Sequence, residues 1–244
     1  MIIIGSCGFA GGDAGVDWMK EIVLEIARDQ GLRFRLALIR SEQDKEYLKR
    51  RYREGRILPL HPELPISEEI IDRSAHIVGV MGHEPIAAAL DNGAQIVLAG
   101  RATDTSLFAA VPLMMGAGAG PAWHAAKTLE CGTASTVQRK RPDSIFAWVR
   151  EDHFDVEPLD MEARCSPQSV ASHTLYENAD PFLITEPDGI IDSTASRYEA
   201  LNDRPSPRNP RHDLQPVRIG ETAALDRRVG QPFSQKLETE LPFR

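Results

Sequence analysis

The chain opens with a glycine-rich loop that could bind an anion through its backbone. Gly5, Gly8 and Gly11 follow the apolar run Ile2–Ile4, and an amphipathic segment comes next. Glycines at such a strand-to-helix turn let backbone N–H groups approach an anion, which the dipole of the helix attracts. The spacing matches neither GxGxxG nor a P-loop, so it indicates a nucleotide only weakly. Two interpretations stay open: a carboxylate or phosphate site, or a tight turn that binds nothing.

The segment GRATDT, residues 100–105, carries a second group of polar side chains. The planar guanidinium of Arg101 suits a carboxylate or a phosphate, and Thr103 can bind a ligand or cap a helix. Asp104 is either a general base or the acid of a helix start that holds Arg101 in place. The segment therefore predicts either an anion site or a structural Arg–Asp pair.

A histidine–glutamate pair, His83 and Glu84, follows another apolar run. Both side chains titrate, and Glu84 is a candidate for proton transfer. The same pair could instead cap a helix at the surface. A lone pair of this kind is more often a surface cap, and its position after an expected strand is the observation that supports a role at the same site as Arg101.

The segment HTLYENADP, residues 173–181, holds three more side chains that can hold or move protons: His173, Tyr176 and Glu177. His173 and Glu177 are four residues apart and share a helix face, where the carboxylate favours the imidazolium. With no third ligand and no HExxH pattern, we expect no metal site. We predict a helix over 166–176 that turns His173 toward the cleft of Arg101; the alternative is a structural His–Glu pair.

These residues need a scaffold, and the apolar pattern predicts one in which strands and helices alternate. Short apolar runs predict strands at 2–4, 33–39, 77–81 and 95–99. Helices are expected before Gly31 and at 42–54, 85–92, 103–113 and 122–130. Ser41 and Asp44 are expected to form a capping box at the start of the helix over 42–54. The stretch 116–121 is expected to break the helix. We expect an α/β core over 1–140, an open, mostly parallel, Rossmann-like sheet with helices on both faces.

Ligands of open α/β sheets bind outside the carboxyl ends of the strands. The loops after the strands at 2–4, 77–81 and 95–99 should therefore lie along one edge of the sheet. Gly8, Glu84 and Arg101 would then line one cleft.

The pattern changes in the second half of the chain. Expected strands at 145–149 and 153–157 indicate a smaller attached α/β region over 141–203. Residues 204–244 hold seven arginines, one lysine, five acids and six of the 17 prolines, whereas residues 1–203 carry 20 basic and 31 acidic groups. Because prolines remove backbone donors, we expect a weakly ordered, irregular tail there, or coil packed on the domain.

Composition narrows the class of protein. A 244-residue chain with 42% hydrophobic and 26% charged residues is neither disordered nor collagen-like, and its apolar runs are too short to span a membrane. A net charge of −8 argues against a nucleic-acid partner. The three cysteines lie far apart and cannot all pair, which suggests the cytoplasm.

The chain resembles the acyclic terpene utilisation (AtuA-like) family from residue 2 to about residue 203. The likeness rests on the glycine-rich first loop and on three blocks in order: GRATD, PAWHAAKTLECG and HTLYENADP. The resemblance implies one shared site, to which the matching positions contribute Gly5, Gly8, Gly11, Gly100, Arg101, Asp104, Glu130, Cys131, His173, Tyr176, Glu177 and Asp180.

The resemblance also implies catabolism of acyclic terpenes or other organic and acyl compounds, often beside a small partner subunit. We expect an enzyme or enzyme subunit of lyase, hydratase or isomerase type that acts on a small carboxylate or acyl substrate by proton transfer. The glycine loop, Arg101, Thr103, Tyr176 and Glu177 would hold the substrate, and His173, Glu84 or Asp104 would move the proton.

The alternative is a non-catalytic ligand-binding or assembly subunit. After residue 204 the sequence departs from the family pattern, so we expect a truncated member that could be inactive. The sequence indicates no particular cofactor, and a homo-oligomer is compatible with it.

Overall fold

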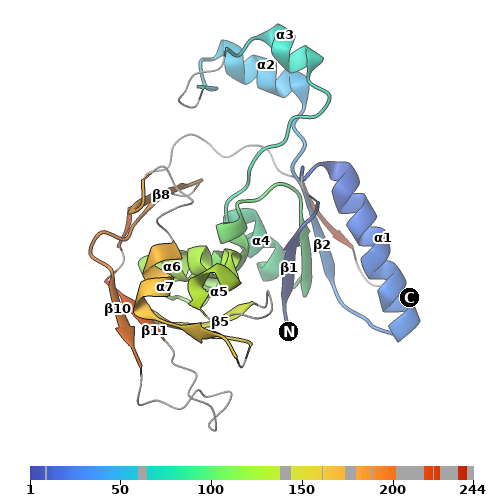
Figure 1. Ribbon diagram of the computed structural model, residues 1–244. Coiled ribbons are helices and arrows are strands. Elements are labelled where there is room, and N and C mark those ends of the chain that lie inside the picture. Colours follow the sequence, from blue (N-terminus) through green and yellow to red (C-terminus); the bar gives the residue numbers. More distant parts are fainter. Residues whose placement is uncertain are drawn as a thin grey trace. The chain divides into compact units, whose positions relative to one another are not determined.

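The computed structural model describes residues 1–8, 10–59, 65–137, 144–160, 162–173, 180–187, 189–201, 217–221, 223–225 and 236–240. The chain divides into two compact units (Figure 1). Unit 1 is Met1–Thr103 with Gly230–Arg244, and unit 2 is Asp104–Val229. The boundaries expected at residues 140 and 203 stay predictions.

Unit 1 is built on a four-stranded sheet with the strand order β1-β3-β2-β13. The strands are β1 (Ile3–Ser6), β2 (Leu36–Arg40), β3 (Ile96–Ala99) and β13 (Lys236–Glu240). The first three are parallel, with Ile96 opposite both Ile3 and Leu36, and β13 is antiparallel to β2. Residues 36–39 are at most 2% exposed, as expected of a strand that is covered on both faces.

Two helices cover the sheet of unit 1 from opposite sides, α1 (Asp13–Gln30) and α4 (Glu84–Asp91) (Figure 1). The crossover from β1 to β2 and the crossover from β2 to β3 run in opposite directions, so right-handed connections place their helices on opposite faces. Val16 of α1 packs with Leu36, Leu38 and Leu98 in a buried cluster. The parallel strands and these helices confirm the expected α/β class.

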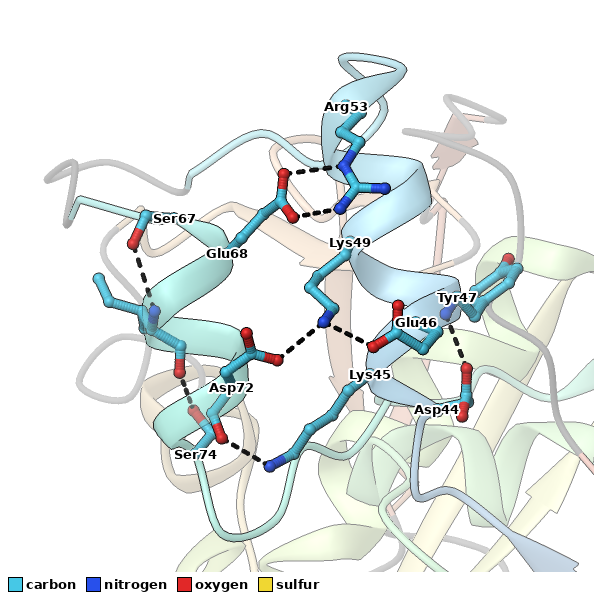
Figure 2. Close-up of polar contacts among 11 residues, drawn as sticks. Asp44, Lys45, Glu46, Tyr47, Lys49, Arg53, Ser67, Glu68, Asp72 and Ser74 are labelled. Carbon is cyan, nitrogen blue, oxygen red and sulfur yellow. Dashed lines mark hydrogen bonds and ion pairs between the residues drawn. The ribbon is translucent and has the colours of Figure 1, made fainter.

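Between β2 and α4 the chain forms the α2–α3 pair, α2 (Lys45–Arg53) and α3 (Glu68–Arg73), shown in Figure 2. Asp44 caps α2 by accepting a hydrogen bond from the Tyr47 N–H (2.7 Å), and Ser67 caps α3. Ser41 is therefore not the cap of this helix, and that prediction is wrong. Two ion pairs join the helices, Lys49–Asp72 and Arg53–Glu68, and Lys49 also pairs with Glu46.

The strand predicted over 77–81 is also wrong. Val78 makes an isolated antiparallel bridge with Glu42, and Met81 makes an isolated parallel bridge with Ala102. Each bridge has a different partner, so the segment crosses from one neighbour to the next and does not extend the sheet. An apolar run of five residues cannot distinguish these two outcomes.

Unit 2 combines helices with antiparallel sheets. Its helices are α5 (Asp104–Met114), α6 (Ala119–Glu130), the short 3-10 helix η1 (Gly132–Ser135) and α7 (Pro167–His173). One sheet has the order β10-β11-β6-β5, with β10 (Arg197–Ala200), β11 (Val217–Gly220), β6 (His153–Pro158) and β5 (Ile145–Val149). The others are β12-β9-β8 and β4-β7, with β12 (Ala223–Leu225), β9 (Gly189–Asp192), β8 (Leu183–Glu186), β4 (Thr136–Val137) and β7 (Arg164–Cys165).

The centre of unit 2 is α6. Every residue from Gly120 to Thr128 is buried, and the helix packs on α5 and on strands of both larger sheets. The stretch 116–121 was expected to break the helix, but α6 already begins at Ala119. Pro121 is tolerated in the first turn of α6, because backbone N–H groups there have no partner within the helix and the missing N–H of proline costs no hydrogen bond.

The described parts of residues 204–244 are three strands, β11, β12 and β13. In β11 the side chains of Val217 and Ile219 are fully buried, whereas Arg218 between them pairs with Asp155 (2.9 Å). This alternation spans only four residues, which is too short to distinguish a strand from scattered apolar residues in a proline-rich sequence.

Candidate functional site

In unit 1, Ser41 joins the loops at the carboxyl ends of the parallel strands. It directly follows β2 and is fully buried. Its hydroxyl donates a hydrogen bond to the Gly11 carbonyl (2.6 Å) and accepts one from the Arg101 N–H (2.8 Å). One side chain thus connects the glycine loop after β1 with the GRATDT segment after β3.

These loops touch each other directly. A Cβ placed on Gly11 would lie 2.5 Å from both the N and the Cα atom of Arg101, and Gly11 has a φ of +66°. A Cβ on Gly100 would lie 2.4 Å from Ser41 Oγ and 2.8 Å from the Gly11 carbonyl oxygen. Glycine is required here because no side chain fits between the two loops. The glycine loop and the segment of Arg101 therefore lie at one edge of the sheet.

The three glycines predicted for anion binding differ in their surroundings. Gly5 lies inside β1, and a Cβ there would meet nothing within 4 Å. Gly8 is exposed and has a φ of +75°, again with open space around it. Only Gly11 is buried in the contact with Arg101.

The segment 77–81 completes this edge. The Gly79 N–H donates to the Ser41 carbonyl (2.8 Å), and the Met81 N–H donates to the Arg101 carbonyl (2.9 Å). The Thr103 N–H donates back to the Met81 carbonyl (3.1 Å). The main chain of Arg101 therefore holds the edge together through both its N–H and its C=O, while its side chain is partly exposed.

Glu42 places a carboxylate at the first turn of α1. Its Oε1 accepts a hydrogen bond from the Asp13 N–H (3.2 Å) and lies 3.0 Å from Nδ1 of His76. In return, the Glu42 N–H donates to the Asp13 carboxylate (3.3 Å). The helix end that the glycine loop would offer to an anion thus already carries a carboxylate of the chain itself.

Glu84 is the first residue of α4, and its side chain is 54% exposed. His83 precedes the helix, with its Nδ1 3.8 Å from the Glu84 carboxylate. Its side chain makes no capping bond to the α4 backbone. That Gly8, Glu84 and Arg101 line one cleft stays a prediction.

In unit 2, the GRATDT and ECG segments meet through side chains. The Thr105 hydroxyl donates to Oε2 of Glu130 (2.9 Å), and Nζ of Lys127 pairs with Oε1 of the same carboxylate. The Lys127 and Glu130 side chains are only 9% and 8% exposed. Asp104, the predicted base, is exposed at the start of α5.

Unit 2 also buries two histidines. His173 is the last residue of α7 and, like His124 of α6, is fully buried. Burial, with a smaller contribution from nearby His173, lowers the pKa of His124 to about 4, so His124 is neutral at physiological pH. Nε2 of His124 lies 3.4 Å from the hydroxyl of Tyr198, whose pKa is raised to about 12 by burial.

Tyr176 and Glu177 lie outside the described residues, whereas Cys131 is partly exposed and Asp180 is exposed. No group of three or more histidine, cysteine, aspartate or glutamate side chains in the described part of the chain could hold a metal ion. The described helices likewise include none that is both long and apolar enough to cross a bilayer.

Sequence reasoning missed Ser41, Glu42, Lys127 and His124 as members of these arrangements. The pattern around Ser41 resembles a helix cap, and Lys127 follows a run of alanines in a helix. The position of Ser41, two residues after the strand expected at 33–39, was the only local signal, since ligand-binding residues of α/β sheets gather after strands.

Comparison with curated proteins and with solved structures finds no match to this chain. A model of one family does match, that of the acyclic terpene utilisation family protein AtuA, over residues 9–136. The match includes Ser41, Arg101, Thr105, Lys127 and Glu130, whereas the HTLYENADP block lies beyond it. Because it covers more than half of the 244 residues, the chain belongs to the AtuA family of acyclic terpene utilisation.

Proposed function

We propose that this protein is an enzyme, or a subunit of one, in the breakdown of acyclic terpenes or related organic acids, and that Arg101 binds the carboxylate or acyl group of its substrate. The observation that carries the proposal is the Ser41 hydroxyl, which joins Gly11 to Arg101 at the carboxyl edge of the parallel strands. In α/β sheets this edge is where ligands bind.

The main chain and the side chain of Arg101 have different surroundings, which supports this proposal. Its backbone N–H and C=O bond to Ser41 and Met81, so the fold depends on its main chain. Its side chain is partly exposed. A planar guanidinium binds a carboxylate through two parallel hydrogen bonds, which fits a substrate anchor.

The type of reaction is proposed from proton-transfer chemistry, as in a lyase, hydratase or isomerase. Asp104 and Glu84 are exposed to solvent, whereas His173 is fully buried within unit 2. The two exposed carboxylates are therefore better supported as bases than the imidazole. Glu42 at the α1 N-terminus supports a substrate held by Arg101 more than one held by the helix dipole.

The test is thermal unfolding of the full chain with 3-methylbut-2-enoate, a short branched carboxylate, and with its coenzyme A thioester. A ligand that binds only the folded chain stabilises it by about 2.7 kcal/mol at 100 times its Kd, which raises the Tm. We expect this rise in the wild-type protein and its loss in Arg101→Ala.

The matched control is Arg73→Ala, since Arg73 is an exposed arginine of the same unit that makes an exposed ion pair with Glu69 at 3.7 Å. It should keep the ligand-dependent rise. A rise that persists in Arg101→Ala would refute the role of Arg101. No rise with either compound would favour the non-catalytic assembly subunit.

The proposal also includes the type of sheet, the location of the protein and its partners. The three parallel strands with helices on both faces support a Rossmann-like sheet. A cytoplasmic location, a small partner subunit and a homo-oligomer are proposed from composition and family resemblance alone.

A further inference from the structure

The outer face of α1 carries an apolar ridge that is exposed to solvent. Trp18 and Ile26 are 62% and 52% exposed, and Ile22, which lies between them at helical spacing, is partly exposed. At a rise of 1.5 Å per residue, the ridge from Trp18 to Ile26 covers about 12 Å of helix. Tryptophan concentrates in protein–protein contacts, where it often contributes much of the binding energy. A largely exposed tryptophan in an apolar ridge therefore indicates a docking surface.

A row of acids runs beside this ridge. Its members are four residues apart and so follow one side of the helix: Asp17, Glu21, Glu25 and Asp29. Asp17 pairs with Arg40 (2.6 Å), whereas the other three are exposed and make no ion pair with a described residue. Like charges at this spacing weaken a helix, and the helix dipole disfavours an acid in the last turn, where Asp29 lies. The stability of α1 therefore does not explain the row.

An aromatic ring beside carboxylates fits the guanidinium of an arginine. The planar group can stack on Trp18 and form paired hydrogen bonds with Glu21, which is three residues away on the same face. A second arginine can pair with Glu25, one turn further along. Lysine offers neither the planar stacking nor the paired bonds. The face thus favours a partner that presents arginines together with aromatic or apolar side chains.

Helix α2 of the same chain presents this chemistry. The Tyr47 ring makes cation–π contacts with two arginines, whose Cζ atoms lie 5.3 Å (Arg50) and 5.4 Å (Arg51) from its centroid. Arg50 and Arg56 are exposed and form no ion pair within the described part of the chain. Leu58, just beyond the helix, is 78% exposed. Arginine, aromatic and apolar groups are therefore available together on this segment.

The two helices also match in charge and length. Residues 45–56 hold six cations and two acids, whereas residues 13–30 hold five acids and two cations. With nine residues, α2 is about 13 Å long, close to the length of the ridge on α1. Within one chain, α1 packs on β2 and β3 and α2 packs on α3. The charged outer faces are therefore available to a second copy.

We propose that the outer face of α1 is the docking surface for α2 of a second copy of this chain, in a two-fold symmetric dimer. Both helices belong to unit 1, so a two-fold axis forms the contact twice, with α1 of each copy against α2 of the other. Trp18 and Ile26 supply the apolar anchor, and Glu21 and Glu25 pair with arginines of the facing helix. The inference deepens the homo-oligomer of the proposed function and rests on it, but it does not depend on substrate binding by Arg101.

The experiment is sedimentation of the full chain over a concentration series. The wild-type protein should form a particle of twice the 27.0 kDa mass of one chain. Trp18→Ala should raise the Kd of the dimer at least about 30-fold, the loss expected of a tryptophan that anchors an interface. Because Trp18 is at the surface, the variant should fold, as judged by circular dichroism.

Charge reversal tests which helices meet. One variant combines Glu21→Arg with Glu25→Arg, and a second combines Arg50→Glu with Arg56→Glu. Each alone should give a folded monomer, because every α1–α2 contact then joins like charges. An equimolar mixture of the two should dimerise again, because every contact in the mixed dimer joins opposite charges. Asp91→Arg, the matched control at an exposed acid of α4, should leave the dimer unchanged.

A wild-type chain that stays monomeric at every concentration would overturn the inference, as would a dimer that both charge-reversed variants keep. A mixture of these variants that stays monomeric would overturn the pairing of α1 with α2. An Arg101-dependent rise in Tm in a monomeric wild-type protein would overturn this inference alone and leave the substrate role of Arg101 standing. A dimer that mixing restores, in a protein without that rise, would support the docking surface and count against the role of Arg101.

Discussion

Replacing the three glycines of the first loop by alanine, one at a time, separates the contact between loops from backbone strain. Gly11→Ala should be the most destabilising. At φ +66° an L-residue costs about 1–2 kcal/mol. The new Cβ would also lie 2.5 Å from the Arg101 main chain, whereas carbon atoms prefer about 3.5–4.0 Å, so the loops must separate by roughly 1 Å. Overpacking of this kind adds about 1–3 kcal/mol.

The expected loss of unfolding free energy for Gly11→Ala is therefore about 2–5 kcal/mol. Gly8→Ala has the same sign of φ but open space around it, so it should cost only about 1–2 kcal/mol. Gly5→Ala meets neither obstacle and should be neutral or stabilising by about 0.5–1 kcal/mol, because alanine loses less backbone entropy in a strand.

Urea unfolding followed by circular dichroism measures all three. Equal losses in Gly11→Ala and Gly8→Ala would refute the argument, since only the contact with Arg101 distinguishes them. The m-values of the three variants should agree, which shows that the change lies in the folded state.

Three further predictions concern stability. Ser41→Ala should lower the free energy of unfolding by about 2–4 kcal/mol, because the Arg101 N–H and the Gly11 C=O both lose their partner; urea unfolding measures it. The free energy of unfolding should fall by up to about 3 kcal/mol as pH falls from about 6.5 to 4. In this range His124 binds a proton in the unfolded chain but stays neutral in the folded chain, where its pKa is about 4. His124→Leu should flatten this pH dependence. Leu48→Ala should destabilise the α2–α3 pair by about 2–4 kcal/mol, because Leu48 is 4% exposed. Arg53→Ala should change the hydrogen-exchange protection of the pair little, because the Arg53 side chain, which pairs with Glu68 (Figure 2), is 60% exposed.

Each of these predictions has a contrary outcome. Ser41→Ala with wild-type stability would mean that the two loops meet without its hydroxyl. A pH dependence that is unchanged in His124→Leu would assign the acid sensitivity to other groups. Equal effects of Leu48→Ala and Arg53→Ala would mean that ion pairs, and not apolar burial, hold α2 to α3.

The sequence predicts the parallel strands and the helices around them well, because their patterns are local. β2 and β3 are apolar runs of strand length that end at polar or glycine positions, and Gly31 ends α1 in the left-handed conformation at φ 63°. The strand predicted over 77–81 is wrong because the structure of this segment depends on distant contacts and not on its local pattern. Its single bridges to Glu42 and Ala102 depend on partners that lie far away in the sequence.

The candidate site was predictable only in part. Arg101 and the glycine loop follow from the rule that ligands bind at the carboxyl ends of strands. The role of Ser41 could not be predicted in this way, because the local pattern fits a helix cap equally well. Its hydrogen-bond partners lie 30 and 60 residues away in the sequence. The Lys127–Glu130 pair has ordinary helical spacing, and only its burial distinguishes it from the pair at Lys49.

The pairing of β13 with β2 has a consequence for how the chain is made. Lys236–Glu240 lies alongside Leu36–Arg40, so β13 can join the sheet of unit 1 only after all of residues 41–235 have been synthesised. Until then, the backbone groups along the edge of β2 have no partner, and an open strand edge invites pairing with other chains. Such a long-range contact also forms late, because the intervening loop must close first. Residues 1–103 expressed alone would keep that edge open permanently, so chaperone binding or aggregation is the expected fate of a chain that stops before β13.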